Sequence, residues 1–275
     1  MDIRIRKDDG RVYNFSSLGF NVSDVQVNPP EIRTDYEESD DTHGVFDGSI
    51  SFGQSIIEMP FDAELEHRTD FEKKKSLLNS ILMDTRPFYL EVLRSEEKGG
   101  YAFVDTTEAP KGLYAPLSNI TGKRYRVRTQ SFVEFKELVR HGEGMAFFET
   151  IENPFAESIN VINRRYTNNE FTFHNQGTQP IDMRAQTETE ITFTGESNGL
   201  TIRNLTTGDV WKYNGSTTSN DEIMLKGVRS LKNGQSIFGQ TNKKLISFAP
   251  GNNKIEVSGT SGDFELNIST RFYFL

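Results

Sequence analysis

The clearest pattern of apolar and polar positions lies in residues 44–93. Residues 49–52 and 56–65 hold the alternating or short apolar runs of half-buried strands. Nearer the N-terminus, residues 2–15 predict two short strands joined by an Asp-Gly turn, because this dipeptide adopts the positive φ that a tight hairpin requires. Residues 34–44 are rich in carboxylates and almost without apolar side chains, so we expect a solvated loop there.

Residues 69–82 predict the one helix of the chain. Phe71 and Leu78 belong to an apolar stripe at helical spacing, and three consecutive lysines lie outside it. Thr69 and Glu72 have the spacing of a capping box at the start of a helix. A helix of about 14 residues does not persist alone in water, so we expect its apolar stripe to lie on the neighbouring sheet.

The second half of the chain has a different pattern of apolar and turn residues. Residues 134–149 fit either a turn of helix or a strand, but beyond them short apolar runs alternate with Gly and Asn turns every ten residues or so. That spacing is typical of an antiparallel sandwich. We therefore expect a mainly β protein of two domains, residues 1–150 and 151–275. The first is a β-sandwich or split-barrel-like domain with one helix, and the second is a β-sandwich.

Composition and charge exclude several classes of protein. The chain has no cysteine, which removes disulfides and thiolate sites and fits folding in a reducing cytoplasm. Its formal net charge is −9, so tight nucleic-acid binding through clustered cations is disfavoured. The N-terminal residues do not resemble a signal peptide, and no apolar run reaches the roughly 18 residues of a membrane span, so we expect no membrane insertion.

Motifs for catalysis, cofactors and metals are missing from the sequence. The four histidines lack the spacing of metal ligands, and neither a phosphate-binding loop nor a nucleophile elbow is present. We expect no enzyme activity, no cofactor and no metal. A hydrolase acting through two carboxylates, such as Glu64 and Glu66, stays open, although 40 acidic residues produce such pairs by chance.

Trp211 and Tyr213 are a candidate ligand or partner surface, because residues two apart share one face of a strand. An exposed aromatic pair of this kind can stack on sugar rings. The alternative is that both side chains belong to the core. The first interpretation makes the protein a carbohydrate-binding β-sandwich that attaches to a cell-surface glycan.

The order of these elements resembles the distal tail (Dit) proteins of long-tailed phages and prophages of Gram-positive bacteria. The resemblance rests on residues 3–22, 44–82, 198–215 and 245–259, which include an Asp-Gly hairpin, a glycine-bearing hairpin before the single helix, and a late Pro-Gly-Asn turn before a strand. Gln54 departs from the family pattern, which commonly has an arginine near this place.

The resemblance implies a structural protein of the virion, made in the bacterial cytoplasm and located at the tail tip. Six copies would form a ring from their N-terminal domains, with a central channel for DNA and an outward galectin-like (jelly-roll) C-terminal domain. The implied partners are the chain itself, the tail tube, tail-associated proteins and receptor-binding proteins. Open strand edges can pair between subunits. The candidate ring-interface or channel-loop residues are Asp40, Asp41, Phe46, Asp47 and Phe52.

Overall fold

The chain folds into two compact units, Met1–Ile159 (unit 1) and Asn160–Leu275 (unit 2). The computed structural model describes residues 2–38, 43, 45–93, 122–131, 133–138, 140–185 and 188–275. Unit 1 continues beyond residue 150, where the sequence placed the boundary, because β12 (Ala156–Ser158) still pairs with β9 (Gly122–Thr129) of unit 1.

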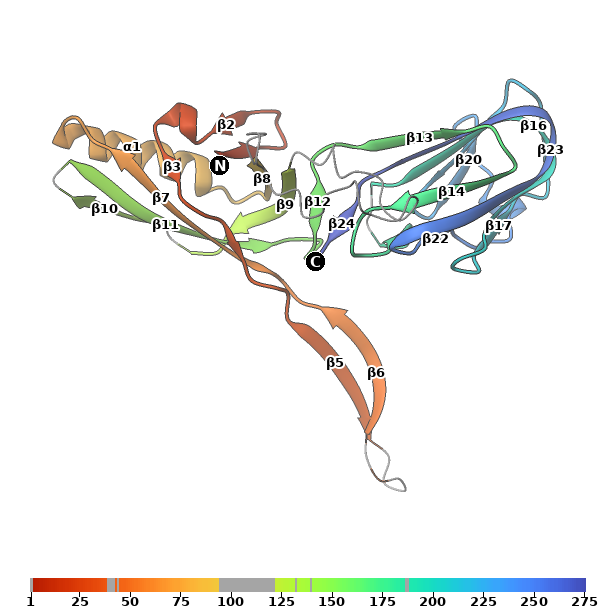
Figure 1. The fold of residues 1–275 in the computed structure, drawn as a ribbon, viewed down its shortest axis with the longest axis horizontal. Coiled ribbons are helices and arrows are strands. Elements are labelled where there is room, and N and C mark those ends of the chain that lie inside the picture. Colours follow the sequence, from red (N-terminus) through yellow and green to blue (C-terminus); the bar gives the residue numbers. More distant parts are fainter. Residues whose placement is uncertain are drawn as a thin grey trace, which may run out of the picture. The chain divides into compact units, whose positions relative to one another are not determined.

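Unit 1 is built on an antiparallel sheet with strand order β2-β1-β8-β9-β11-β7-β3 (Figure 1). Strand β4 also pairs with β7, β10 with β11, and β12 with β9, while β5 and β6 form a separate two-stranded sheet. The other strands of this unit are β1 (Asp2–Arg6), β2 (Val12–Asn14), β3 (Asn21–Val22), β4 (Gln26–Val27), β5 (Ile32–Glu38), β6 (Val45–Phe52), β7 (Ile56–Glu64), β8 (Phe88–Leu93), β10 (Glu134–Leu138) and β11 (His141–Thr150).

The alternation in β7 shows how this strand contributes to the core of unit 1. Ile57, Met59, Phe61 and Ala63 are buried, and the residues between them are partly exposed. One face of the strand therefore faces the core and the other lies outside it, as the period of two predicts. The ambiguous segment 134–149 is resolved as β10 and β11, which form a hairpin beside β7.

Helix α1 (Arg68–Leu82) confirms the predicted helix, but a different pair of residues caps it. The backbone N–H of His67 donates a hydrogen bond to Oδ2 of Asp70 over 2.9 Å. The capping pair therefore begins two residues before the predicted Thr69 and Glu72. In the part of the chain that the structure describes, no helix is long and apolar enough to span a bilayer.

Aromatic rings hold α1 against the sheet. The ring of Phe71 stacks on Phe135 of β10 with the centroids 4.8 Å apart, and Phe135 in turn stacks on Phe61 of β7 at 5.7 Å. At the other end of the helix, Oγ1 of Thr129 donates a hydrogen bond to the carbonyl of Leu82 over 2.6 Å. The helix is thus held to the sheet by ring stacking at one end and by a hydrogen bond at the other. Aromatic pairs add stability beyond that of the apolar area they bury. A short 3₁₀ helix, η1 (Ser16–Leu18), follows β2.

Unit 2 is an antiparallel sheet of strand order β13-β23-β16-β19-β20-β21, with β14 added on β23 and with β17 and β18 added on β16. Strands β15 and β22 pair separately. Its elements are β13 (Ile162–Tyr166), β14 (Glu170–Asn175), β15 (Ile181–Asp182), β16 (Glu190–Asn204), β17 (Val210–Lys212), β18 (Ser216–Thr217), β19 (Glu222–Lys226), β20 (Arg229–Lys232), β21 (Gln235–Ser236), η2 (Phe238–Gln240), β22 (Ser247–Phe248), β23 (Gly251–Thr270) and β24 (Tyr273–Phe274).

Two long strands, β16 and β23, organise unit 2. Their pairing is interrupted by register shifts between Gly195 and Thr201, so each strand contributes to the sheet on both sides of the irregularity. Such bulges bend strands and increase their twist. Buried rings such as Phe193 and Phe264, 5.6 Å apart, fill the interior. The mainly β fold class expected from the sequence is confirmed, with α1 the single α-helix of the described residues.

Candidate interaction surface

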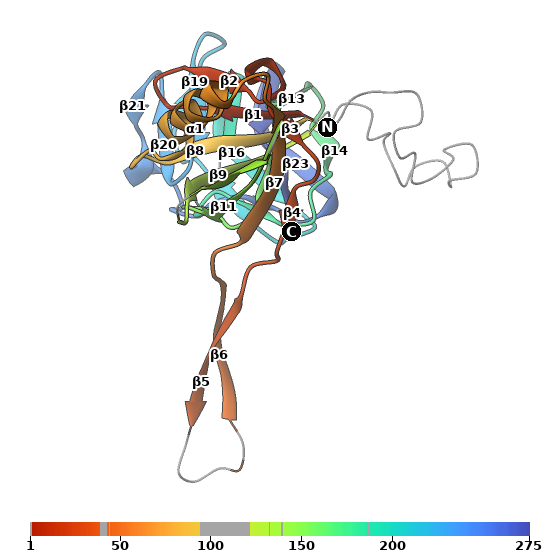
Figure 2. The same ribbon diagram turned by 90° about the vertical axis from the view of Figure 1, so that its left-hand side faces the viewer.

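The hairpin of β5 and β6, here named the arm, is an exposed part of unit 1. Figures 1 and 2 show it extending away from the sheet of unit 1 in both views. Ile32 pairs with Phe52, and Thr34 with Ile50, so these side chains share one face of the hairpin. Ile32 is 64% exposed and Ile50 is 60% exposed. Two large apolar side chains on the same hairpin are thus left in contact with solvent.

The arm has a bulge in its middle. Between the pairs Thr34–Ile50 and Tyr36–Asp47, the register shifts by one residue, so that Gly48 and Ser49 lie opposite Asp35. The Oγ of Ser49 donates a hydrogen bond to Oδ2 of Asp35 over 2.8 Å. A Cβ on Gly48 would lie 2.4 Å from the carbonyl oxygen of Asp35, and a glycine is therefore required at this position.

The root of the arm is anchored to β11 and to the segment after it. The backbone N–H of Ser55 donates a hydrogen bond to Oγ1 of Thr150 over 2.8 Å, and Oγ of Ser55 donates one to the carbonyl of Pro154 over 3.0 Å. The rings of Phe52 and Phe155 meet edge to face with their centroids 5.3 Å apart. The arm is thus an extension of a well-bonded sheet and not an independent loop.

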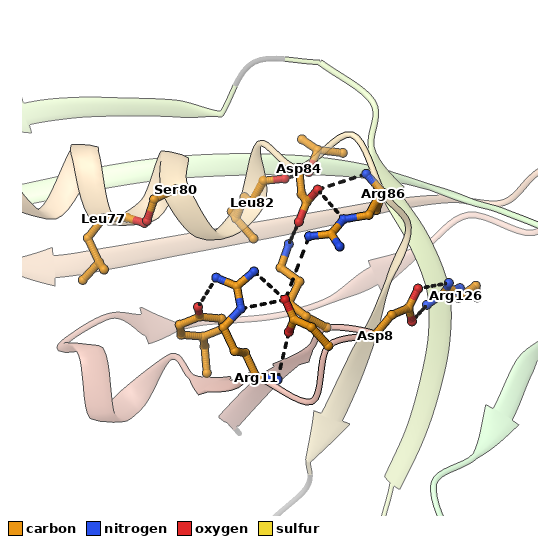
Figure 3. Close-up of polar contacts among 12 residues, drawn as sticks. Asp8, Arg11, Leu77, Ser80, Leu82, Asp84, Arg86 and Arg126 are labelled. Atoms are coloured by element: carbon orange, nitrogen blue, oxygen red, sulfur yellow. Dashed lines mark hydrogen bonds and ion pairs between the residues drawn. The ribbon is translucent and has the colours of Figure 1, made fainter.

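A polar network in unit 1 joins the β1–β2 turn, the end of α1 and β9 (Figure 3). The guanidinium of Arg126 donates two hydrogen bonds to the carboxylate of Asp8, at 2.6 and 2.7 Å. Oδ1 of Asp84 accepts a hydrogen bond from the backbone N–H of Arg86, and its Oδ2 lies 3.3 Å from the buried Nζ of Lys7. Because each of these carboxylates is paired, the network acts as a clamp between segments.

The electrostatics of this network differ from those of an acid–base site. Hydrogen bonds from Arg126 lower the pKa of Asp8, the guanidinium of Arg11 lowers the pKa of Asp9 to about 2, and the backbone N–H of Arg86 lowers the pKa of Asp84. A general acid at neutral pH needs a carboxyl group whose pKa is raised. These carboxylates stay ionised at neutral pH and stabilise the fold.

The structure places the candidate site residues in three different situations. Phe52 lies at the root of the arm, partly exposed. Phe46 and Asp47 belong to β6, where the strand is described but these two side chains are not. Asp40 and Asp41 fall outside the described residues, between β5 and β6.

Trp211 and Tyr213 do not form an exposed surface, so that prediction is wrong. Trp211 is 0% exposed and Tyr213 is 4% exposed. The indole Nε1 of Trp211 donates a hydrogen bond to Oγ of Ser230 over 3.2 Å inside unit 2. The alternative interpretation, that both side chains belong to the core, is confirmed. The carbohydrate-binding hypothesis therefore loses the two residues on which it rested.

Strand β5 and the apolar face of the arm were not predicted, because residues 34–44 were expected to form a loop. The signal was the alternation of Ile32, Thr34 and Tyr36, which places these three residues on one face of a strand. Among the residues that the structure describes, no three His, Cys, Asp or Glu side chains gather as metal ligands would.

Comparison with known proteins agrees with this architecture. Residues 8–193 match the family model of the phage tail protein RIFT-related domain. The crystal structure of the Dit (gp 19.1) protein of phage SPP1 aligns with a TM-score of 0.64 at 13% identity, over 98% of this chain and 99% of that chain. That protein is described as a paradigm of the hub adsorption apparatus in phages that infect Gram-positive bacteria.

A chain of the phage P2 baseplate, in its activated conformation with Ca, aligns over 100% of this chain and 99% of that chain, with a TM-score of 0.43 and 10% identity. No curated protein matches the chain. The family match begins in the β1–β2 turn, includes the arm, α1 and the rest of unit 1, and reaches β16. With well over half of its length matched, this chain belongs to the family of phage tail proteins that carry the RIFT-related domain.

Proposed function

We propose that this chain is a distal tail protein, six copies of which form a ring that joins the tail tube to the tail tip or baseplate. The observation that carries the proposal is the arm, whose apolar face is exposed in a single chain of a phage tail family. Apolar area left in water is unfavourable, and pairing between subunits removes it. The protein acts through shape and self-association and not through a catalytic step.

The proposed ring encloses a channel through which DNA passes. Each chain has a formal charge of −9, and the phosphate backbone of DNA is also negative. A wall formed by such chains repels the DNA, which favours passage over retention. The ring contacts the tail tube on one side, and on the other it carries tail-associated and receptor-binding proteins. The fold shared with SPP1 Dit across both units supports this role at the tail tip of the virion.

A mass measurement in solution, with electron microscopy of the same sample, tests the proposal. The purified chain should assemble into a species with six times the mass of the 31.3 kDa monomer, visible as a ring with a central opening. A protein that stays monomeric over the whole accessible concentration range contradicts the proposal.

A matched pair of substitutions tests whether the arm carries the assembly. Ile50→Asp places a charge on the apolar face of the arm, and Val228→Asp places one at an equally exposed position of unit 2, both being 60% exposed. Both variants should fold with stabilities within about 0.5 kcal/mol of the parent, as exposed substitutions do. Only Ile50→Asp should lose the ring. A ring that forms equally well with Ile50→Asp removes the arm from the interface.

A further inference from the structure

Three asparagines of the chain are each followed by glycine, and all three lie in unit 2: Asn198, Asn214 and Asn233. An asparagine in this context can deamidate without an enzyme, because the backbone nitrogen of the next residue attacks its side-chain carbonyl carbon. Glycine favours the attack, since it has no side chain to shield that nitrogen and few limits on its backbone geometry. All three asparagines are exposed. Their hydrogen bonds therefore decide which of them can react.

The reaction consumes only water. The glycine nitrogen forms a bond to Cγ of the asparagine, the bond from Cγ to Nδ2 breaks, and the proton of the glycine N–H leaves with the ammonia that is released. Water then opens the cyclic succinimide at one of its two carbonyl groups, which gives aspartate or isoaspartate. The asparagine side chain must be free to turn toward the backbone, and the glycine N–H must be free as well.

The side chain of Asn233 is held in place in the turn between β20 and β21. Its Oδ1 accepts a hydrogen bond from the backbone N–H of Glu222 over 2.8 Å, and its Nδ2 donates one to Oδ1 of Asp221 over 2.6 Å. Both bonds have to open before Cγ can reach the nitrogen of Gly234. The fold therefore protects Asn233.

At Asn198 the attacking nitrogen is engaged instead. Asn198 belongs to β16, and the backbone N–H of Gly199 donates a hydrogen bond to the carbonyl of Gly215 over 3.0 Å. Attack through this nitrogen waits for local opening of the strand. The fold therefore protects Asn198 as well.

Asn214 has neither kind of protection. It lies between β17 and β18, outside both strands. Within the part of the chain that the structure describes, its side chain makes no hydrogen bond and the N–H of Gly215 donates none. A Cβ on residue 215 would lie 2.4 Å from the hydroxyl of the buried Tyr213, so the packing requires glycine there. The most reactive neighbour is thus kept beside the asparagine whose reacting groups are both free.

We propose that Asn214 is a site of spontaneous deamidation, while the fold protects Asn198 and Asn233. The conversion adds one carboxylate to an exposed segment of unit 2. It needs no partner chain, so the inference does not depend on the proposed ring.

Isoaspartate at position 214 would also disturb the backbone around it. The N–H of Asn214 donates a hydrogen bond to the carbonyl of Gln240 over 2.9 Å, and the carbonyl of Gly215 accepts the bond from Gly199. Isoaspartate inserts a methylene into the main chain between these two anchor points, so at least one of the two bonds is lost. Aspartate leaves the main chain unchanged.

Peptide mapping by mass spectrometry, after incubation of the folded chain in a mildly alkaline buffer, tests the proposal. The three asparagines fall in separate tryptic peptides, because lysines or arginines lie between them. Asn214 should convert at least about tenfold faster than Asn198 and Asn233, whose reactions wait for local opening. Equal rates at the three positions, or a faster reaction at either of the other two, overturn the proposal.

The same measurement in denaturant separates the effect of the fold from that of the local sequence. Once the chain is unfolded, the three positions should react at similar rates. If Asn214 kept its full lead in denaturant, the local sequence would explain the difference and the structural inference would fail. Asn214→Gln is the control variant, since its longer side chain closes the ring far more slowly: the conversion should disappear at position 214 and stay unchanged at the other two.

Two further measurements test the steps of the argument. Asp221→Ala removes the acceptor of Nδ2 of Asn233, so conversion of Asn233 should rise by about threefold or more while that of Asn214 stays the same. Hydrogen exchange at the amide of residue 199 or 214 should be faster in the isoaspartate product than in Asn214→Asp. An unchanged rate at Asn233 contradicts its protection by this bond, and equal exchange contradicts the expected disturbance of the backbone.

Discussion

The backbone N–H of Ser55 donates a buried hydrogen bond to Oγ1 of Thr150, and the backbone N–H of Thr150 returns one to the carbonyl of Ser55 over 3.0 Å. This reciprocal pair lies where the arm ends and β7 begins. It sets the direction in which the arm leaves the sheet, because both strands are fixed at their shared end. In the proposed ring, that direction decides which surface of the neighbour the arm meets.

Thr150→Val should destabilise unit 1. Valine keeps the shape of threonine but cannot accept the bond from Ser55, so a buried N–H loses its partner at a cost of about 1–3 kcal/mol. Denaturant unfolding should show the loss as a lower midpoint with an unchanged slope. The same substitution at the exposed Thr194 of β16 should change stability by no more than about 0.5 kcal/mol. Equal effects at the two positions would remove the special role of the Ser55–Thr150 pair.

Gly48→Ala should disorder the arm without unfolding unit 1. The new Cβ would meet the backbone carbonyl of Asp35 at 2.4 Å, which forces the two strands apart at the bulge. The core is remote from this position, so we expect an unchanged melting temperature together with loss of the ring in a mass measurement. Stronger protection of arm amides from hydrogen exchange in the variant than in the parent would contradict the prediction.

Gly53→Ala is a matched control for that change. Gly53 lies at the root of the same hairpin, and its Cβ would meet the guanidinium of Arg33 at 3.1 Å, the mobile end of a flexible side chain. Arg33 can move aside at little cost. Gly53→Ala should therefore keep the ring, and its loss in both variants would indicate that any added bulk near the arm prevents assembly.

The elements of the core could be predicted from the sequence, because a strand or helix with one buried face has apolar residues at regular spacing. The alternation of β7 and the apolar stripe of α1 follow from one face being buried. None of the arm side chains that the structure describes is buried. The carboxylates among residues 34–38 also make the alternation of Ile32, Thr34 and Tyr36 hard to recognise in the sequence. The alternation in β5 therefore becomes clear only from its pairing with β6.

Trp211 and Tyr213 illustrate a second limit. The sequence places them on one face of a strand, but it does not say whether that face points into a sandwich or out of it, since both faces carry the same period. The bond from Trp211 to Ser230 joins β17 to β20, a contact between residues 19 positions apart that no local pattern contains. Burial of this strand is a property of the assembled unit 2.

Trp211→Phe should lower the stability of unit 2 by about 2 kcal/mol. The change leaves a cavity where the indole packs and removes the partner of Ser230, and both effects oppose folding. Circular dichroism during denaturant unfolding measures the change. Phe238→Leu, at an exposed position of η2, should have little effect. If the variant were as stable as the parent but no longer bound a surface glycan, the result would instead support the carbohydrate-binding hypothesis.

Asp8→Asn should reduce stability in a way that depends on pH. The two hydrogen bonds from Arg126 lower the pKa of Asp8 in the folded chain, so the carboxylate form is favoured by folding. As the pH falls towards the ordinary value of 3.8, the unfolded chain takes up the proton first, and the contribution of this group to stability is lost. The contribution is therefore present above about pH 5 and disappears below the lowered pKa.

Unfolding measured at pH 7, 5, 3.5 and 2.5 tests this sign. Because the Asp8 side chain is half exposed, solvent screening limits the loss in Asp8→Asn to about 1 kcal/mol at pH 7. The difference between parent and variant should shrink as the pH falls and vanish near the acid end. Glu196→Gln, an exposed change on β16, should give a difference close to zero throughout. If the gap between parent and Asp8→Asn widened at low pH, the Asp8–Arg126 pair would not be the clamp between the β1–β2 turn and β9.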